Sequence, residues 1–141
     1  MVQWLIVGVV AACLTAALTA KLSGSKKRDF YTAFMAATAT VYIGSALAGG
    51  DLKTLVLETS IAAVLFSATL AGQWRSVKFT AIAFFLHGVW DILHSAKDLG
   101  ANAGASFPIL CVAYDWVIAS VIWYLAPALD ARKPAPPVQT A

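Results

Sequence analysis

Charged residues are scarce in this chain. Only 12% of its 141 residues are Asp, Glu, Lys or Arg, whereas 60% are hydrophobic. A soluble domain of this size normally carries about a quarter charged residues. The composition therefore excludes an ordinary water-soluble fold.

The small excess of positive charge does not indicate a nucleic-acid partner. Ten Lys and Arg residues against seven Asp and Glu residues give a formal net charge of +3. A nucleic-acid binder gathers such residues on a basic face with aromatic side chains between them, but here they occupy short gaps between apolar runs. We expect no binding of nucleic acid.

Cysteine is also rare, and its spacing indicates no disulfide framework. Cys13 and Cys111 lie within apolar stretches and form no C-x-x-C motif, so they do not define a redox compartment. Proline is concentrated in the last segment, 131–141 (ARKPAPPVQTA). We expect this Pro-rich tail to be disordered.

What the chain does contain is five long apolar runs. They cover residues 2–20, 30–49, 52–72, 77–96 and 106–129. About 20 helical residues cross a hydrocarbon core of roughly 30 Å. Helices satisfy their own backbone in lipid, and the runs are too long and too uniformly apolar for barrel strands. We predict an all-α integral membrane protein, a bundle of five transmembrane helices forming one domain over residues 1–130.

The basic residues orient this bundle. Eight of them follow the first, third and fifth runs, and only Lys53 and Lys97 lie on the other side; the eight are Lys21, Lys26, Lys27, Arg28, Arg75, Lys78, Arg132 and Lys133. Cytoplasmic loops retain positive residues. We predict a multi-pass protein of the cell inner (plasma) membrane, with its N-terminus outside and its C-terminus in the cytoplasm.

Five ionisable side chains lie inside the predicted spans: Glu58, His87, Asp91, His94 and Asp115. Such residues cost at least ~2.5 kcal/mol each on insertion scales, so they are functional candidates. His87, Asp91 and His94 recur at i, i+4 and i+7 and share one helix face. At a rise of 1.5 Å per residue, all five come about 5–15 Å below the outer boundary. This predicts a polar pocket open to the outer half of the membrane.

Imidazoles and carboxylates are the ligands of a divalent metal site, and a cation keeps buried carboxylates ionised. We predict His87, Asp91, Asp115 and Glu58 as metal ligands. Zinc is favoured over iron or manganese because it suits these ligands with one position left open.

The expected function is that of a metal-dependent enzyme acting on a lipid-like or apolar small molecule. Hydrolysis or acid/base chemistry would use Glu58, His94 and Tyr42. Glu58 or His94 would move a proton, and Tyr42 or His94 would donate a hydrogen bond to a developing oxyanion.

Two other classes of function fit the same residues. One is a small proton-coupled or metal transporter, since intramembrane carboxylates and histidines form relays there. The other is a non-catalytic membrane subunit that binds a ligand in the same pocket. Any one of the five side chains also suits a purely structural bond between helices. Expected partners are membrane lipids, a small apolar or amphipathic ligand, and a second copy or a larger membrane protein.

Overall fold

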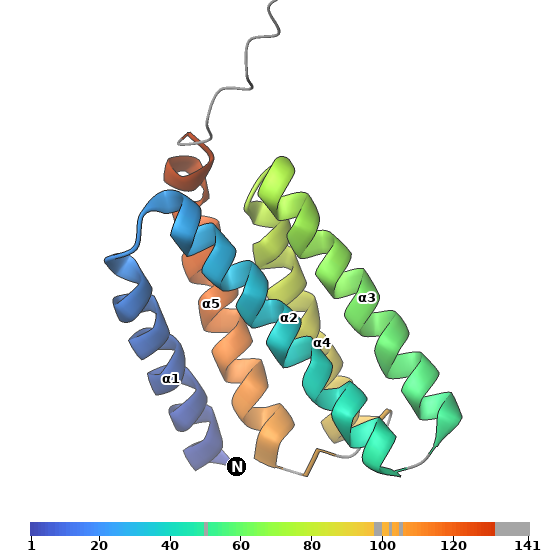
Figure 1. The fold of residues 1–141 in the computed structure, drawn as a ribbon. Helices are drawn as coiled ribbons and strands as arrows, with labels where there is room; N and C mark the ends of the chain where they lie inside the picture. The colour runs from blue at the N-terminus through green and yellow to red at the C-terminus, as the bar shows by residue number, and fades with distance from the viewer. Residues whose placement is uncertain (50, 98–99, 102, 105, 132–141) are drawn as a thin grey trace, which may run out of the picture.

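The computed structural model describes residues 1–49, 51–97, 100–101, 103–104 and 106–131, and the predicted tail at 132–141 lies outside them. The described residues form an all-helical bundle (Figure 1). Its helices are α1 (Val2–Ala20), α2 (Gly24–Gly49), α3 (Leu52–Trp74), α4 (Lys78–Lys97) and α5 (Ser106–Asp130).

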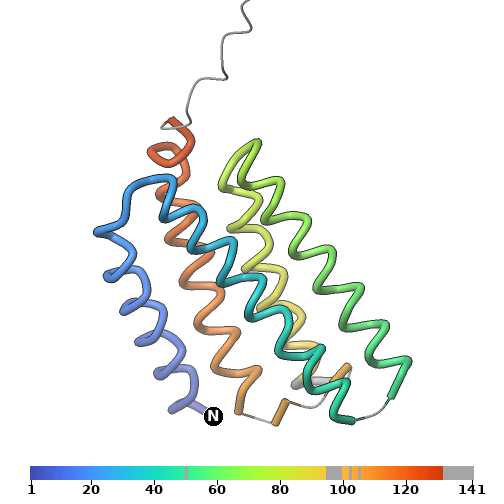
Figure 2. The backbone as a smooth tube through the Cα atoms, in the orientation of Figure 1, coloured from blue at the N-terminus to red at the C-terminus, as the bar shows by residue number. Residues whose placement is uncertain are grey.

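The helices run alternately up and down, so their connections gather at two ends (Figure 2). The Met1 end carries the start of α1, the α2–α3 turn and the α4–α5 connection. The Asp130 end carries the α1–α2 turn, the α3–α4 turn and the last turn of α5. In Figure 1, α1 lies at one edge beside α5, α3 lies at the other edge, and α2 crosses in front.

The most extensive packing joins α4 to α5, α1 to α5 and α2 to α3. Gly8 permits the close approach of α1 to α5, because a Cβ atom there would collide with the Leu110 carbonyl oxygen. The core between the helices is largely aromatic and aliphatic. Its largest fully buried apolar members are Tyr31, Tyr42, Phe84, Met35, Ile118 and Ile122.

Four of the described helices, α1, α2, α3 and α5, are long and apolar enough to cross a membrane. Many large apolar side chains on their outer faces are exposed, including Leu14, Leu18 and Val64, as expected for surfaces that meet lipid. The prediction of a helical membrane bundle is confirmed at this level. α4 carries His87 and Asp91 among its apolar residues.

The start of α2 differs from the predicted one. The helix begins at Gly24 rather than at residue 30, because the polar segment that we read as a loop continues the helix. Arg28 on this added turn is buried. Its guanidinium donates to the Leu129 carbonyl at 3.0 Å and to Asp130 Oδ1 at 3.1 Å. α2 and α5 are thereby joined at the Asp130 end.

At the Met1 end, Asp51 caps α3. Its carboxylate accepts hydrogen bonds from the backbone amides of Lys53 and Thr54 and from the Thr54 hydroxyl, which satisfies orphan donors of the first helical turn. The Thr54 hydroxyl, followed by its amide, lowers the pKa of Asp51. α3 therefore begins at a defined cap.

Candidate functional site

Three ionisable side chains meet between α4 and α5. His87 and Asp91 lie one turn apart on α4, and Asp115 faces them from α5. Each is at most 1% exposed. His87 Nδ1 is 2.6 Å from Asp115 Oδ2 and 3.5 Å from Asp91 Oδ2. One ligand atom from each residue lies within 4.8 Å of the others. We call His87, Asp91 and Asp115 the triad.

Two atoms of the triad have no hydrogen-bond partner in the described part of the chain. They are His87 Nε2 and Asp91 Oδ2, and both are buried. A buried polar atom normally finds a partner, so each such exception requires an explanation. The short contact to Asp115 occupies Nδ1 of the imidazole and leaves Nε2 as the free nitrogen. Metal-binding histidines are held in this way, with a carboxylate on the other nitrogen.

Tyr42 from α2 completes the surroundings of Asp91. Its hydroxyl donates a hydrogen bond of 2.5 Å to Asp91 Oδ1. Its ring stacks on the imidazole of His94, with centroids 4.0 Å apart and planes inclined by 16°. Because Tyr42 is 1% exposed, both contacts are shielded from solvent. This one side chain connects the triad to a second polar cluster.

The second cluster is centred on Glu58 from α3. Glu58 Oε1 is 2.9 Å from His94 Nε2 and accepts the backbone amide of Ala101 at 2.7 Å. Glu58 Oε2 accepts the indole N–H of Trp90 at 3.1 Å. We call Glu58, Trp90, His94 and Ala101 the Glu58 cluster. It joins α3, α4 and the α4–α5 connection at the Met1 end.

Gly100 closes over this cluster. Its φ of +86° lies in the left-handed region, which favours glycine. A Cβ atom at this position would contact Glu58 Oε1 and would lie 2.6 Å from His94 Nε2. The backbone of the connection therefore lies directly against the imidazole–carboxylate pair.

The five predicted ionisable residues are all buried, and the structure divides them between two adjoining clusters. Both carboxylate oxygens of Glu58 are engaged, and Glu58 is not one of the three residues grouped as candidate metal ligands. His94 also uses both nitrogens, with Nδ1 3.1 Å from the Trp90 carbonyl. The structure therefore brings the predicted residues close together, but in pairs that the sequence did not predict.

Sequence reasoning missed two members of the site. Trp90 was not among the predicted site residues because it is not ionisable, but its indole N–H donates to Glu58. Its position one turn before His94, on the same helix face, is a signal that could have revealed it. The Ala101 amide carries no side-chain signal. Its part in the site depends on the path of the connection alone.

Comparison with known proteins assigns the chain to a family but does not indicate an activity. No curated protein and no solved structure matches the chain. One family model matches residues 3–129, which include every member of the triad and of the Glu58 cluster. The chain belongs to this family, which is described as a family of unknown function (DUF6010).

Proposed function

We propose that this protein is a membrane enzyme whose triad binds one divalent metal ion. The observation that carries the proposal is the buried, unpartnered Nε2 of His87, on an imidazole whose Nδ1 is held by Asp115. Asp91 Oδ2 is a second buried oxygen that lacks a hydrogen bond within the described residues. A metal ion would engage both atoms.

Charge balance supports the same proposal. In the described part of the chain, the ion-pair contacts of Asp91 and Asp115 are to His87 alone. Two buried carboxylates are costly unless they are compensated. A divalent cation bound by Asp91 and by Nε2 of a neutral His87, with the Asp115 carboxylate on Nδ1 of the same imidazole, forms a neutral unit. The ligand atoms would draw together on binding, since atoms around one ion at about 2 Å lie no more than roughly 4 Å apart.

The neighbouring side chains would supply the rest of the chemistry. A bound zinc ion would polarise an oxygen and provide hydroxide near neutral pH. Iron or manganese would be the second choice of metal. Tyr42 would donate a hydrogen bond to an oxyanion that develops beside Asp91. Glu58 and His94 would hold or move a proton during the reaction. We propose hydrolysis or acid/base chemistry on a lipid-like or apolar small molecule, because a site buried between membrane helices is reached most directly from lipid.

The proposed topology places the site in the outer half of the membrane. All five helices would span it, with the Met1 end outside and the C-terminus in the cytoplasm, because the basic residues concentrate at the Asp130 end. The Glu58 cluster, at the Met1 end, would then face the exoplasmic side. The host would be the cell inner (plasma) membrane.

The Glu58–His94 pair favours a second candidate function, a proton-coupled carrier. Together with His87 and Asp115 it makes two buried imidazole–carboxylate pairs, and such pairs carry protons in transporters. In that case the triad would hold a proton and no metal. Metal content therefore distinguishes the two functions.

The test is elemental analysis of purified full-length protein, followed by zinc titration calorimetry. We expect near-stoichiometric metal in the wild type. His87→Ala and Asp91→Ala should each remove most of it, because each removes a ligand atom. His94→Ala is the matched control: it deletes the other buried imidazole, whose nitrogens both have partners, and should retain the metal.

Melting temperature and gel filtration would establish that each variant is folded. Wild-type protein that is free of metal and shows no zinc binding would overturn the proposal. Equal loss of metal from His94→Ala and His87→Ala would also contradict it, because the ion would then not belong to the triad.

A further inference from the structure

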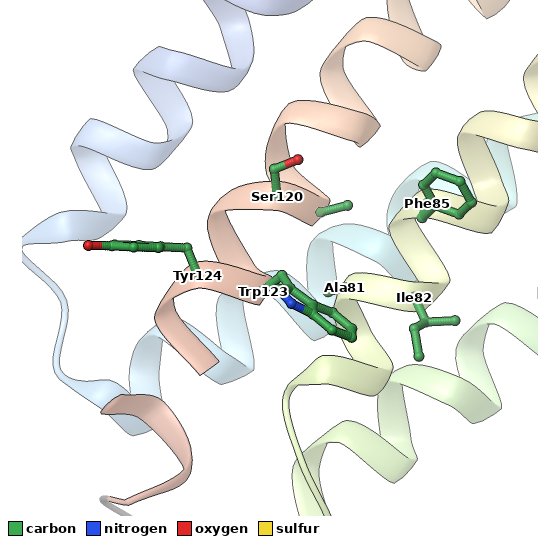
Figure 3. Close-up of a pocket in the computed structure, with 7 residues that line it drawn as sticks. Ala81, Ile82, Phe85, Ser120, Trp123 and Tyr124 are labelled. Carbon is green, nitrogen blue, oxygen red and sulfur yellow. The ribbon is translucent and has the colours of Figure 1, made fainter. Parts of the chain in front are cut away.

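An apolar groove of about 470 Å³ runs along the outer surface between α4 and α5, towards the Asp130 end (Figure 3). Residues on α4 and α5 line it, among them Ala81, Ile82, Phe85, Ser120, Trp123 and Tyr124. Several of these are large apolar side chains that remain exposed, with Phe85 at 50% and Trp123 at 51%. In a membrane, this groove faces lipid.

The groove is lined mainly by apolar groups. The polar groups among its lining side chains are the hydroxyl of Ser120 and, on the exposed side chains of Trp123 and Tyr124, an indole N–H and a phenol. The Ser120 hydroxyl already donates to the Trp116 carbonyl of its own helix at 2.8 Å. A hydrocarbon chain satisfies such a surface, because it brings no polar group that needs a partner.

At one end of the groove, the ring of the lining residue Phe85 stacks on Trp116 of α5. Phe85 and Trp116 have ring centroids 5.6 Å apart and planes inclined by 17°. The indole N–H of Trp116 donates to the Phe85 carbonyl at 3.3 Å. This pair joins α4 to α5 at the end of the groove farther from Lys78.

The other end carries a positive charge. Lys78, the first residue of α4, lies one turn before Ile82 on the same helix face. Its Nζ is 5.0 Å from the centroid of the Trp123 ring, which lines the groove. The exposed ammonium group therefore lies beside the apolar wall. In a membrane, a lysine at the end of a helix extends its charged group toward the lipid phosphates.

We propose that this groove binds one anionic phospholipid, with an acyl chain along α4 and α5 and the phosphate group paired with Lys78. The lysine at one end and the mainly apolar wall beyond it match the two parts of such a molecule. The proposal does not depend on a metal in the triad, because none of the triad residues lines the groove.

Native mass spectrometry of the detergent-purified full chain tests this lipid site. Phosphatidylglycerol and phosphatidylcholine with identical chains would be titrated in parallel. We expect one retained phosphatidylglycerol, bound about fivefold more tightly than phosphatidylcholine. Lys78→Gln should abolish that preference. Lys26→Gln, a matched change of an exposed lysine at the same end of the bundle, should leave it intact.

Ser120→Phe tests the groove itself, because the added ring would fill it. This variant should lose retention of both lipids at an unchanged melting temperature. If it fails to fold, the comparison of Lys78→Gln with Lys26→Gln still decides. Equal affinity for both lipids, or a preference that survives in Lys78→Gln, would refute the proposal. A dimer that Ser120→Phe dissociates would assign the groove to a second copy of the chain instead.

Discussion

At the scale of single residues, Gly100 offers a sharp test of the Glu58 cluster. A Cβ atom there would meet Glu58 and His94 in addition to the left-handed backbone, which costs a non-glycine residue roughly 1–2 kcal/mol. We predict that Gly100→Ala lowers the free energy of unfolding by more than this strain alone. Denaturant titration in detergent, followed by tryptophan fluorescence, would measure the loss.

Gly104 is the matched control for this prediction. Its φ of +84° is nearly the same, but no atom of the described chain lies within 4 Å of the place its Cβ would take. Gly104→Ala should therefore show only the backbone strain. If the two variants lost equal stability, Gly100 would not be packed against the imidazole–carboxylate pair.

The residue scale is also where sequence reasoning reached its limit. The spacing of His87, Asp91 and His94 predicts one shared face, because helix geometry alone fixes it. His87 and His94 lie about 10 Å apart along α4, so depth in the bundle decides which of them each carboxylate can meet. Whether Glu58 and Asp115 face α4 at all depends on how far α3 and α5 rotate about their own axes. Neither rotation follows from hydropathy, since a run that is apolar on all sides has no preferred face.

At the scale of helices, the first turns of α2 are fastened to the end of α5 through Arg28. We predict that Arg28→Met destabilises the protein by about 1.5–3 kcal/mol, the range for hydrogen bonds to charged groups. The change removes the donors to Leu129 and Asp130. It leaves Asp130 with its bonds from Ser76 and from the Val77 amide. Equilibrium unfolding would measure the difference.

Lys26→Met provides the comparison for Arg28→Met. Lys26 lies on the same turns of α2 but is exposed, so its loss should change stability little. Equal effects of the two substitutions would mean that net charge at the Asp130 end, rather than the contacts of Arg28, determines the stability there.

Helix bounds were predicted well wherever an apolar run ends at a turn. α1 agrees at both ends, and α3, α4 and α5 agree to within two residues. α2 is the exception, because hydropathy marks where a helix would enter lipid and not where it begins. Lys and Arg are good helix formers, and so the polar residues before Phe30 extend α2 beyond its apolar part.

At the scale of the whole molecule, the proposed topology predicts that the two termini lie on opposite sides of the membrane. A C-terminal green fluorescent protein fusion should fluoresce, and a C-terminal alkaline phosphatase fusion should be inactive, because the C-terminus would be cytoplasmic. The same two reporters fused before Met1, behind a cleaved export signal, should give the opposite pattern. An active phosphatase at the C-terminus would overturn the orientation.

The overall architecture was predictable only in outline. The number of helices and their alternating direction follow from five runs with short connections. Their neighbours do not: α1 packs mainly on α5, and α2 packs mainly on α3 while it crosses α4 and α5. Small residues such as Gly8 decide these approaches locally, and the sequence does not say which helix will fill the space that a glycine leaves.

Tyr42 ties the axial position of α2 to both polar clusters. Other side chains of α2 also meet α4 and α5, such as Tyr31 against Phe84 and Phe34 against Tyr114. The Tyr42 ring, however, lies flat on the His94 imidazole while its hydroxyl meets the carboxylate of Asp91. Sliding α2 by a single turn, about 5.4 Å, would carry the hydroxyl past its acceptor and uncover the face of His94 in the same movement. α2 therefore cannot slide along the bundle without breaking the contacts of Tyr42 with both clusters at once.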